Sequence, residues 1–364
     1  GLSLNLEKCR VTPSAGIQSK VENSAFPGWK FGFSRNIKVL GAAVGDQEFC
    51  EGLVRERRRK ASPVLQGIAE LGNSQCAFPL LRNCASFAKL AYSIRTTPSI
   101  AMAGELEAFD METRGAFVTM THLNPGDAAW ARAQWSSGVC GLGLCSLAQH
   151  GDAALVSSTV STAALQCTIY PGLSQAGVLA ESSFAETLGR LAARLPPALL
   201  LSLHNGDRVP QKVRTKALDR TASGRVLLDP MTPRHLQAHL QLASAIGTDS
   251  WLHATPNREL GTAMDSELFR LALARRLRLP LLDELSTCPL CGASLDVYLD
   301  HALVCMCGGD RTLRHNAVRE AVHIEACSAG LRAEKEKAGL LPPAPEDERL
   351  LGEGGGERRP ADVW

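Results

Sequence analysis

Aromatic side chains are scarce in this sequence. Phe, Trp and Tyr make up 5% of the 364 residues, whereas hydrophobic residues as a class make up 45%. Aliphatic and alanine side chains must therefore supply most of the packing, which favours a mostly helical chain. The hydrophobic fraction suffices for a buried core, and it excludes wholesale disorder and collagen-like repetition.

The sequence also lacks a segment typical of secretion or of a membrane span. It opens on Gly1, and no basic stretch followed by an apolar one indicates a signal peptide. The longest uncharged stretch, 153–180, contains nine Ser, Thr and Gln residues, which argues against membrane insertion. Twelve cysteines without a secretion signal indicate reduced thiols in an intracellular protein.

A strong excess of charge of either sign is lacking as well, since the formal net charge is +2. The charges are nevertheless segregated along the chain. Residues 1–100 carry 14 Lys and Arg against 7 Asp and Glu, whereas residues 101–200 carry 4 against 8. A polyanionic partner would therefore be bound by local patches rather than by overall charge.

Apolar periodicity predicts a chain of helices after a short extended region. A hairpin that ends at Gly41 is predicted from Phe31, Phe33, Ile37, Val39 and Leu40. Helical spacing begins at about residue 47 and continues in a second segment, through Leu80 to Ala91, that stops at Thr97-Pro98. Further helices are expected at about 100–118, 146–168, 183–194, 232–246, 264–277 and 313–328.

The clearest chemical signal is a cluster of potential metal ligands. Cys288 and Cys291 are followed by His301 and Cys305, in the arrangement C-x2-C-x9-H-x3-C. A C-x-x-C turn brings two thiolates to one metal ion, and a second pair of ligands one helical turn apart can complete a tetrahedron around zinc.

Two alternatives to this ligand set stay open at this point. Cys307 or His315 could take the place of Cys305, so the fourth ligand is the least certain. The C-x-x-C pair could also be a redox pair, or the cysteines could simply be buried thiols.

A second signal is a basic run inside a helical pattern. It comprises Arg55, Arg57, Arg58, Arg59 and Lys60. Such a run suits contacts with phosphate groups. A solvated helix face or a localisation signal explains it equally well. No P-loop, H-E-x-x-H or G-x-S-x-G motif occurs, so phosphate transfer, zinc proteolysis and serine hydrolysis have no support from motifs.

Taken in order, several segments resemble the C-terminal half of a non-LTR (LINE-type) retrotransposon reverse transcriptase that carries a restriction-like endonuclease. GLSLNLEKC at 1–9 resembles the palm motif after the catalytic aspartates, and KVLGAAVG at 38–45 resembles the primer grip. Residues 71–98 resemble the helical thumb, and GLGL at 141–144 resembles the helical linker. The run from Trp251 to Phe269, CPLCG, Asp300-His301, GGDR at 308–311, RHN at 314–316 and RPAD at 359–362 resemble the zinc knuckle and its approach to the nuclease.

The resemblance implies a mainly α fold with a small β remnant. It divides the chain into a palm end and primer grip (1–45), a helical thumb (46–125), a helical linker region (126–284), a CCHC zinc knuckle (285–320) and the start of a truncated endonuclease (321–364). It implies a structural Zn²⁺, with Mg²⁺ expected only in the intact parent enzyme, and a nuclear location. The partners implied are an RNA template, a DNA primer or target DNA, and no membrane.

Specific roles also follow from the resemblance alone. Lys8 would lie near the leaving pyrophosphate, and Asp362 matches the first metal-binding Asp of the nuclease. Leu40 and Gly41 would hold the primer terminus. The basic run Arg55, Arg57, Arg58, Arg59 and Lys60, together with Arg314, would contact nucleic acid. The palm aspartates would precede Gly1 and the rest of the nuclease would follow Trp364, so this chain alone is expected to be an inactive fragment.

Two interpretations compete with this one. The chain could be a zinc-stabilised interaction or scaffold protein that binds no nucleic acid, which the acidic balance of residues 101–200 and 288–364 favours. It could also be the relic of a decayed element that never folds stably, because a palm without its central strands leaves apolar surface unpaired.

Overall fold

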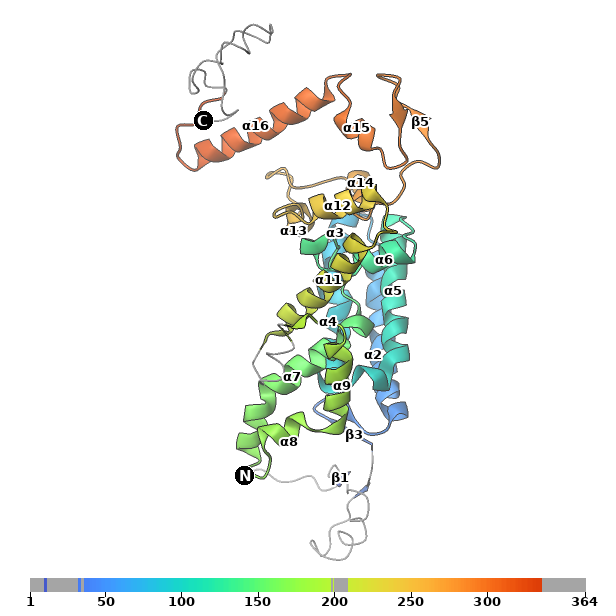
Figure 1. The fold of residues 1–364 in the computed structure, drawn as a ribbon, viewed down its shortest axis with the longest axis vertical. Helices are drawn as coiled ribbons and strands as arrows, with labels where there is room; N and C mark the ends of the chain where they lie inside the picture. Colours follow the sequence, from blue (N-terminus) through green and yellow to red (C-terminus); the bar gives the residue numbers. More distant parts are fainter. Residues whose placement is uncertain (1–9, 12–31, 34–35, 198, 200–208, 336–364) are drawn as a thin grey trace, which may run out of the picture. The chain divides into compact units, whose positions relative to one another are not determined.

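The structure is a computed structural model that describes residues 10–11, 32–33, 36–197, 199 and 209–335. The chain divides into two compact units, Gly1–Leu279 and Pro280–Trp364. Helices dominate both units, and the strands are short, so the prediction of a mainly α chain with a small β part is confirmed (Figure 1). Among the described residues, no helix combines the length and the apolar character that a membrane span requires.

The first unit is built almost wholly of helices. They are α2 (Gln47–Ala69), α3 (Ser74–Leu80), α4 (Phe87–Thr96), α5 (Ala103–Thr121), α6 (Asp127–Ala133), α7 (Leu147–Ile169), α8 (Gln175–Leu179), α9 (Ser182–Ala192), α11 (Gln211–Leu228), α12 (Arg234–Ala243), α13 (Ser250–His253) and α14 (Ser266–Arg276). A π-helical turn, η2 (Leu81–Ala85), and two 3₁₀ turns, η3 (Ser99–Met102) and η4 (Ser137–Val139), connect them. The strands of this unit are β1 (Arg10–Val11), parallel to β2 (Gly32–Phe33), and the antiparallel pair β3 (Ile37–Val39) and β4 (Ala42–Val44).

Local sequence signals account for where several of these helices begin. Asp46, Asn73, Ser146 and Asp265 each accept a hydrogen bond from the backbone N–H three residues later. These side chains satisfy one of the free N–H groups of the first helical turn, which is why Asp, Asn and Ser favour the N-cap position. Polar residues just before apolar periodic segments therefore set the helix starts.

The main core lies between α2, α4, α5 and α7, which pack against one another (Figure 1). Its side chains are mostly Leu, Ile, Ala and Met, as the scarcity of aromatics predicts. The few aromatics are placed at its centre. Phe78 and Phe269 are both almost fully buried, and their ring centroids lie 5.8 Å apart. Such aromatic pairs add to the free energy of burial.

The hairpin near residue 40 differs from its prediction. The strands pair on either side of Leu40 and Gly41, with Ile37 opposite Val44, so Gly41 lies in the turn rather than at the end of the hairpin. Leu40 has φ +48° and Gly41 φ +90°. A two-residue turn that matches the twist of the strands needs positive φ at both positions, which Gly adopts easily.

The segment from Leu80 to Ala91 is also not one helix. It divides into the end of α3, the π-helical turn η2 and α4, and the N–H of Ser86 donates to the carbonyl of Leu81 over 3.0 Å. Pro79 lies inside α3 and contributes no N–H group, and prolines and π-turns are common causes of helix interruption. The predicted stop before Thr97-Pro98 is confirmed, because α4 ends at Thr96.

The second unit consists of a small hairpin and two helices. Strands β5 (Ser286–Thr287) and β6 (Ser294–Leu295) are antiparallel, and α15 (Asp300–Val304) and α16 (Asp310–Ser328) follow. Cys288, Leu295 and Cys305 form a small buried cluster with Leu282 and Leu299. Among the described residues this is a small core, and a bound metal ion is a common way to stabilise a unit with so little buried apolar surface.

Candidate metal centre

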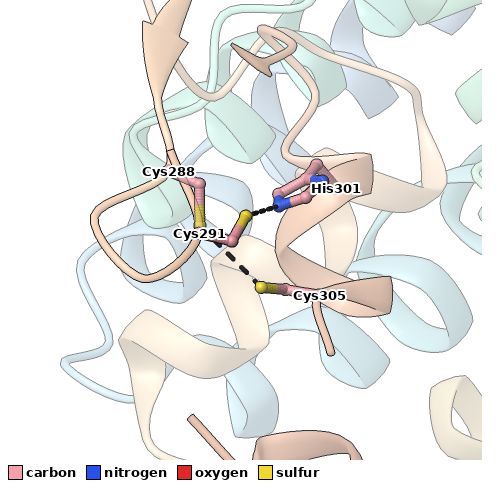
Figure 2. A group of neighbouring side chains, drawn as sticks. All are labelled: Cys288, Cys291, His301 and Cys305. Atoms are coloured by element: carbon pink, nitrogen blue, oxygen red, sulfur yellow. Dashed lines mark hydrogen bonds between the residues drawn. The ribbon is translucent and has the colours of Figure 1, made fainter. Parts of the chain in front are cut away.

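Four side chains of the second unit converge on one point. They are Cys288, Cys291, His301 and Cys305 (Figure 2). Their ligand atoms, three thiol sulfurs and one imidazole nitrogen, all lie within 4.8 Å of one another. Cys288 and Cys305 are buried, His301 is half-buried and Cys291 is exposed. The arrangement therefore offers one N and three S donors to a single ion.

The distance between the sulfurs of Cys288 and Cys305 fits a tetrahedral zinc site. The sulfurs of Cys288 and Cys305 are 3.9 Å apart, and the sulfur of Cys291 is 3.1 Å from Nε2 of His301. Zn–S bonds of about 2.3 Å at tetrahedral angles place two sulfurs about 3.8 Å apart. A disulfide, by contrast, needs a sulfur–sulfur distance of about 2.05 Å. Four protein ligands would leave no open position for a substrate, as in structural zinc sites.

Backbone geometry explains how the first two ligands meet. The chain turns back between them, since the N–H of Gly292 donates to the carbonyl of Cys288 and the N–H of Cys288 donates to the carbonyl of Ala293. Gly292 has φ +75°, a conformation that a side chain disfavours. Backbone N–H groups of Leu290 and Cys291 lower the pKa of the Cys288 thiol to about 6. A metal ion binds the thiolate, so this turn favours the form that ligates.

The second pair of ligands is positioned by Asp296, a residue that the ligand spacing alone does not reveal. Its carboxylate accepts hydrogen bonds from the backbone N–H groups of Tyr298, Asp300 and His301, at 2.9, 3.0 and 3.3 Å. These bonds hold the start of α15, from which His301 and, one turn later, Cys305 project. The signal in the sequence is the Asp before a short helix, a typical acceptor for free N–H groups.

Replacing Asp296 by Ala is expected to weaken zinc binding by about 10- to 100-fold, the usual effect of losing a residue that orients metal ligands. The measurement is competition with a chromophoric zinc chelator. Asp283 provides a matched control, because it is exposed and has no hydrogen-bond or ionic partner among the described residues. Equal zinc affinity in Asp296→Ala and Asp283→Ala would contradict this role.

Among the described residues, the only His, Cys, Asp and Glu group with this geometry is the one above. It contains Cys305 and neither Cys307 nor His315, so the structure favours Cys305 as the fourth ligand. The predicted coordination by a CCHC set is therefore consistent with the geometry, and a metal such as zinc could bind there. No family model, curated protein or solved structure matches this chain.

The other predicted site residues lie elsewhere. Lys8 and Asp362 fall outside the described residues, so their roles stay predictions. Leu40 is exposed in the turn between β3 and β4, where its carbonyl accepts a hydrogen bond from the hydroxyl of Tyr92. The carbonyl of Gly41 accepts from Arg57. Arg314, on α16, donates to the carbonyl of Leu303. The contacts of Leu40, Gly41 and Arg314 with a primer or another nucleic acid therefore stay predictions.

The basic run lies on α2, and much of its charge is already paired. Nε of Arg55 and Nε of Arg58 each donate to the carboxylate of Glu105 on α5, at 2.6 and 2.8 Å, and Arg58 also pairs with Glu112. Lys60 pairs with Glu56 on its own helix. In the part of the chain that the structure describes, Arg59 has no acidic partner. The phosphate contacts predicted for this run stay a prediction.

Glu105 is expected to make the stability of the first unit acid-sensitive. Burial raises its pKa, but hydrogen bonds from Arg55 and Arg58 outweigh burial and hold the pKa below its ordinary value. Its contribution to stability is then present above the unfolded-state pKa of about 4.3 and is lost as the pH falls through the lower folded-state value.

The Glu105→Gln variant should therefore lose less stability than wild type between about pH 5 and pH 3. Urea unfolding at a series of pH values measures this difference. Glu107→Gln on the same helix is the control, because Glu107 is exposed. If the free energy of unfolding falls equally in wild type and Glu105→Gln between about pH 5 and pH 3, the contacts of Glu105 with Arg55 and Arg58 add nothing to stability.

Proposed function

We propose that the chain is a zinc-stabilised nucleic-acid-binding fragment of a retrotransposon RNA-directed DNA polymerase and endonuclease. The observation that carries the proposal is the Cys288, Cys291, His301 and Cys305 group, whose ligand atoms lie within 4.8 Å. It coincides with the segment that resembles the family's zinc knuckle. The bound zinc would hold β5, β6 and α15 together, because the buried cluster around Cys288 and Cys305 is small.

Two further features support this proposal. The mainly helical first unit suits the thumb and linker that the resemblance implies. The order of the motifs from residue 1 to residue 364 follows the order in the family. Neither catalytic centre of the parent is expected in this chain, so its retained activity would be binding to an RNA template with a DNA primer, or to target DNA, with the nucleus as its location.

The decisive experiment measures binding of the whole chain to an RNA–DNA template–primer duplex over a series of salt concentrations, with zinc quantified in the same sample. We expect about one zinc per chain and an affinity that falls steeply with salt, because phosphate contacts release counterions. Absence of binding at about 50 mM salt would contradict the nucleic-acid function. Absence of zinc would contradict the zinc-stabilised fold of the second unit.

A scaffold function is the second candidate, and one observation favours it. Arg55 and Arg58, which the resemblance assigns to template–primer contacts, are paired with Glu105 and Glu112 within the unit. Counter-charges inside the protein reduce the attraction of a basic run for phosphates. A chain that holds zinc but binds no duplex would support this candidate.

A further inference from the structure

A cavity of about 630 Å³ opens in the first unit beside η2 and α4, where α11 and the loop before α7 form its other walls. Four cationic side chains line it: Arg82, Arg95, Lys212 and Lys216. Its volume lies within the range of about 300–1,000 Å³ that is typical of ligand sites. The residues of this cavity lie outside the basic run on α2 and outside the metal centre.

The positive charge of this cavity is only partly compensated inside the protein. Asp249, which does not line the cavity, acts on the charge of Arg82. The cavity's one lining carboxylate, Asp219, already accepts hydrogen bonds from Nε2 of His150 at 3.0 Å and from the N–H of Ser136 at 2.9 Å. Arg95 donates to Gln211, a neutral side chain. Lys212 and Lys216 are exposed and have no acidic partner within the described ranges. Arg55 and Arg58 on α2 are paired with carboxylates of the protein, whereas Lys212 and Lys216 are available to an external anion.

Arg82 is the most constrained of the four. Its Nη2 donates to the carbonyl of Leu252 at 3.1 Å and lies 3.3 Å from Nδ1 of His253, and its guanidinium lies over the ring of Phe78. Its Nη1 is buried and has no hydrogen-bond partner in the described structure. Because this atom has almost no accessible surface, only the rest of the Arg82 side chain can face the cavity. Phosphate oxygens are favoured partners of a guanidinium, because its planar set of donors matches them.

The backbone around Arg82 lets the loop at Gly143 lie close to the Arg82 side chain. Arg82 lies in the π-helical turn η2, a rare conformation that often marks functional sites. Gly143 has φ +76°, and a Cβ atom there would lie 3.2 Å from Cδ of Arg82. Arg276 fixes the loop that contains Gly143, since it donates to the carbonyls of Gly141 and Ser137. The wall that Arg82 packs against is thus held in place before any ligand binds.

An aromatic ring completes the lining. Phe87, at the start of α4, is half-buried and borders the cavity. Cationic side chains that follow a backbone, combined with an aromatic ring on which a base stacks, are the combination that single-stranded nucleic acids require. Phe87 also packs against the main core, so the side of its ring that borders the cavity is the part open to a base. A duplex keeps its bases stacked inside and would not use this surface.

From this combination we infer that the cavity binds a single-stranded segment of nucleic acid, with adjacent phosphates at Arg82, Lys212 and Lys216 and one base against Phe87. The inference rests on the proposed nucleic-acid function and gives it a location in the first unit. It predicts that single-stranded binding depends on this cavity and not on positive charge in general.

The test compares variants of the full chain by fluorescence anisotropy with a 12-nucleotide single strand over a salt series. Lys212→Ala/Lys216→Ala should bind at least about ten-fold more weakly than wild type near 0.1 M salt. The slope of log K against log salt should become less negative by about 1.4, which is about 0.7 for each of the two phosphates that the variant no longer neutralises. Phe87→Leu, which keeps an apolar side chain in place, should weaken binding at least about five-fold, as expected for a lost base stack.

The matched control is Arg234→Ala/Arg258→Ala, which removes the same charge from two exposed residues that do not line the cavity. We expect it to bind the strand as wild type does. An equal loss in this control and in Lys212→Ala/Lys216→Ala would overturn the inference, because charge alone would then explain binding.

The same variants are also measured with the template–primer duplex, so that the two proposals can fail separately. If wild type binds nucleic acid and Lys212→Ala/Lys216→Ala binds the single strand unchanged, the cavity assignment is wrong while the proposed function stands. If wild type binds neither the strand nor the duplex, both are wrong.

Discussion

The double variant Cys288→Ser/Cys291→Ser is expected to lose its zinc entirely, from about one ion per chain to none. Both thiols come from one turn, so their loss leaves His301 and Cys305, two ligands that cannot close a tetrahedron. The free energy of zinc binding to small structural sites is about 10–16 kcal/mol at neutral pH, and it is largely the folding free energy of the site. Residues 285–320 should therefore unfold locally.

Metal analysis of the purified chain gives the zinc content, and amide hydrogen exchange locates the unfolding. Exchange should become fast in β5, β6 and α15 and stay slow in the core helices α2, α5 and α7, because the two units are separate compact regions. Cys307→Ser is the control, since Cys307 is exposed and lies outside the ligand group. Unchanged zinc content in the double variant would rule out the proposed metal centre.

The metal centre shows what local spacing can and cannot predict. The four ligands could be found from C-x2-C-x9-H-x3-C, because the spacing itself encodes a turn and a helical step. The same spacing leaves Cys307 open as an alternative to Cys305, since both follow His301 closely. In the structure it is Cys305, at the end of α15, whose sulfur lies 3.9 Å from that of Cys288. Asp296 escapes prediction because a ligand motif specifies the residues that bind the metal and not those that orient them.

The helices show a similar limit. Segments with apolar spacing and a polar N-cap, such as α7 and α14, lie close to their predicted ranges. The 18-residue helix α11 was not predicted, because its buried side includes Arg214, Asp219 and Ser223, which an apolar periodicity counts as surface. The pairing of Arg55 with Glu105, 50 residues away, equally has no local signal. Polar side chains that are buried against partners far away in the sequence therefore cannot be predicted from local patterns.

The buried pair of His150 and Asp219 is expected to contribute strongly to the stability of the first unit. Replacing His150 by Ala should lower the free energy of unfolding of the first unit by about 3–5 kcal/mol, the usual result of removing one partner of a buried pair. His150 is 1% exposed, and its ring nitrogens lie 2.9 Å from the carbonyl of Ser146 and 3.0 Å from the carboxylate of Asp219. Replacing the ring by a methyl group therefore removes a hydrogen-bond partner from both the carbonyl of Ser146 and the carboxylate of Asp219.

In His150→Ala the carboxylate of Asp219, itself 2% exposed, would keep the N–H of Ser136 as its one donor among the described residues. Urea unfolding followed by tryptophan fluorescence measures the loss, because Trp130, Trp135 and Trp251 all lie in the first unit. His122→Asn is the control. His122 is exposed at φ +55°, a conformation that Asn adopts readily.

The double variant His150→Leu/Asp219→Leu separates the pair from the packing around it. Removing both polar groups leaves no unpaired buried carboxylate, so the double variant should be more stable than His150→Ala although it changes more atoms. If instead the double variant is the less stable, the cost at His150 comes from lost packing against α7 and α11 and not from the charge left on Asp219. The same result would bear on the cavity beside Arg82. Asp219 borders that cavity, so a change in its hydrogen-bond partners would change the carboxylate that faces Arg82, Lys212 and Lys216.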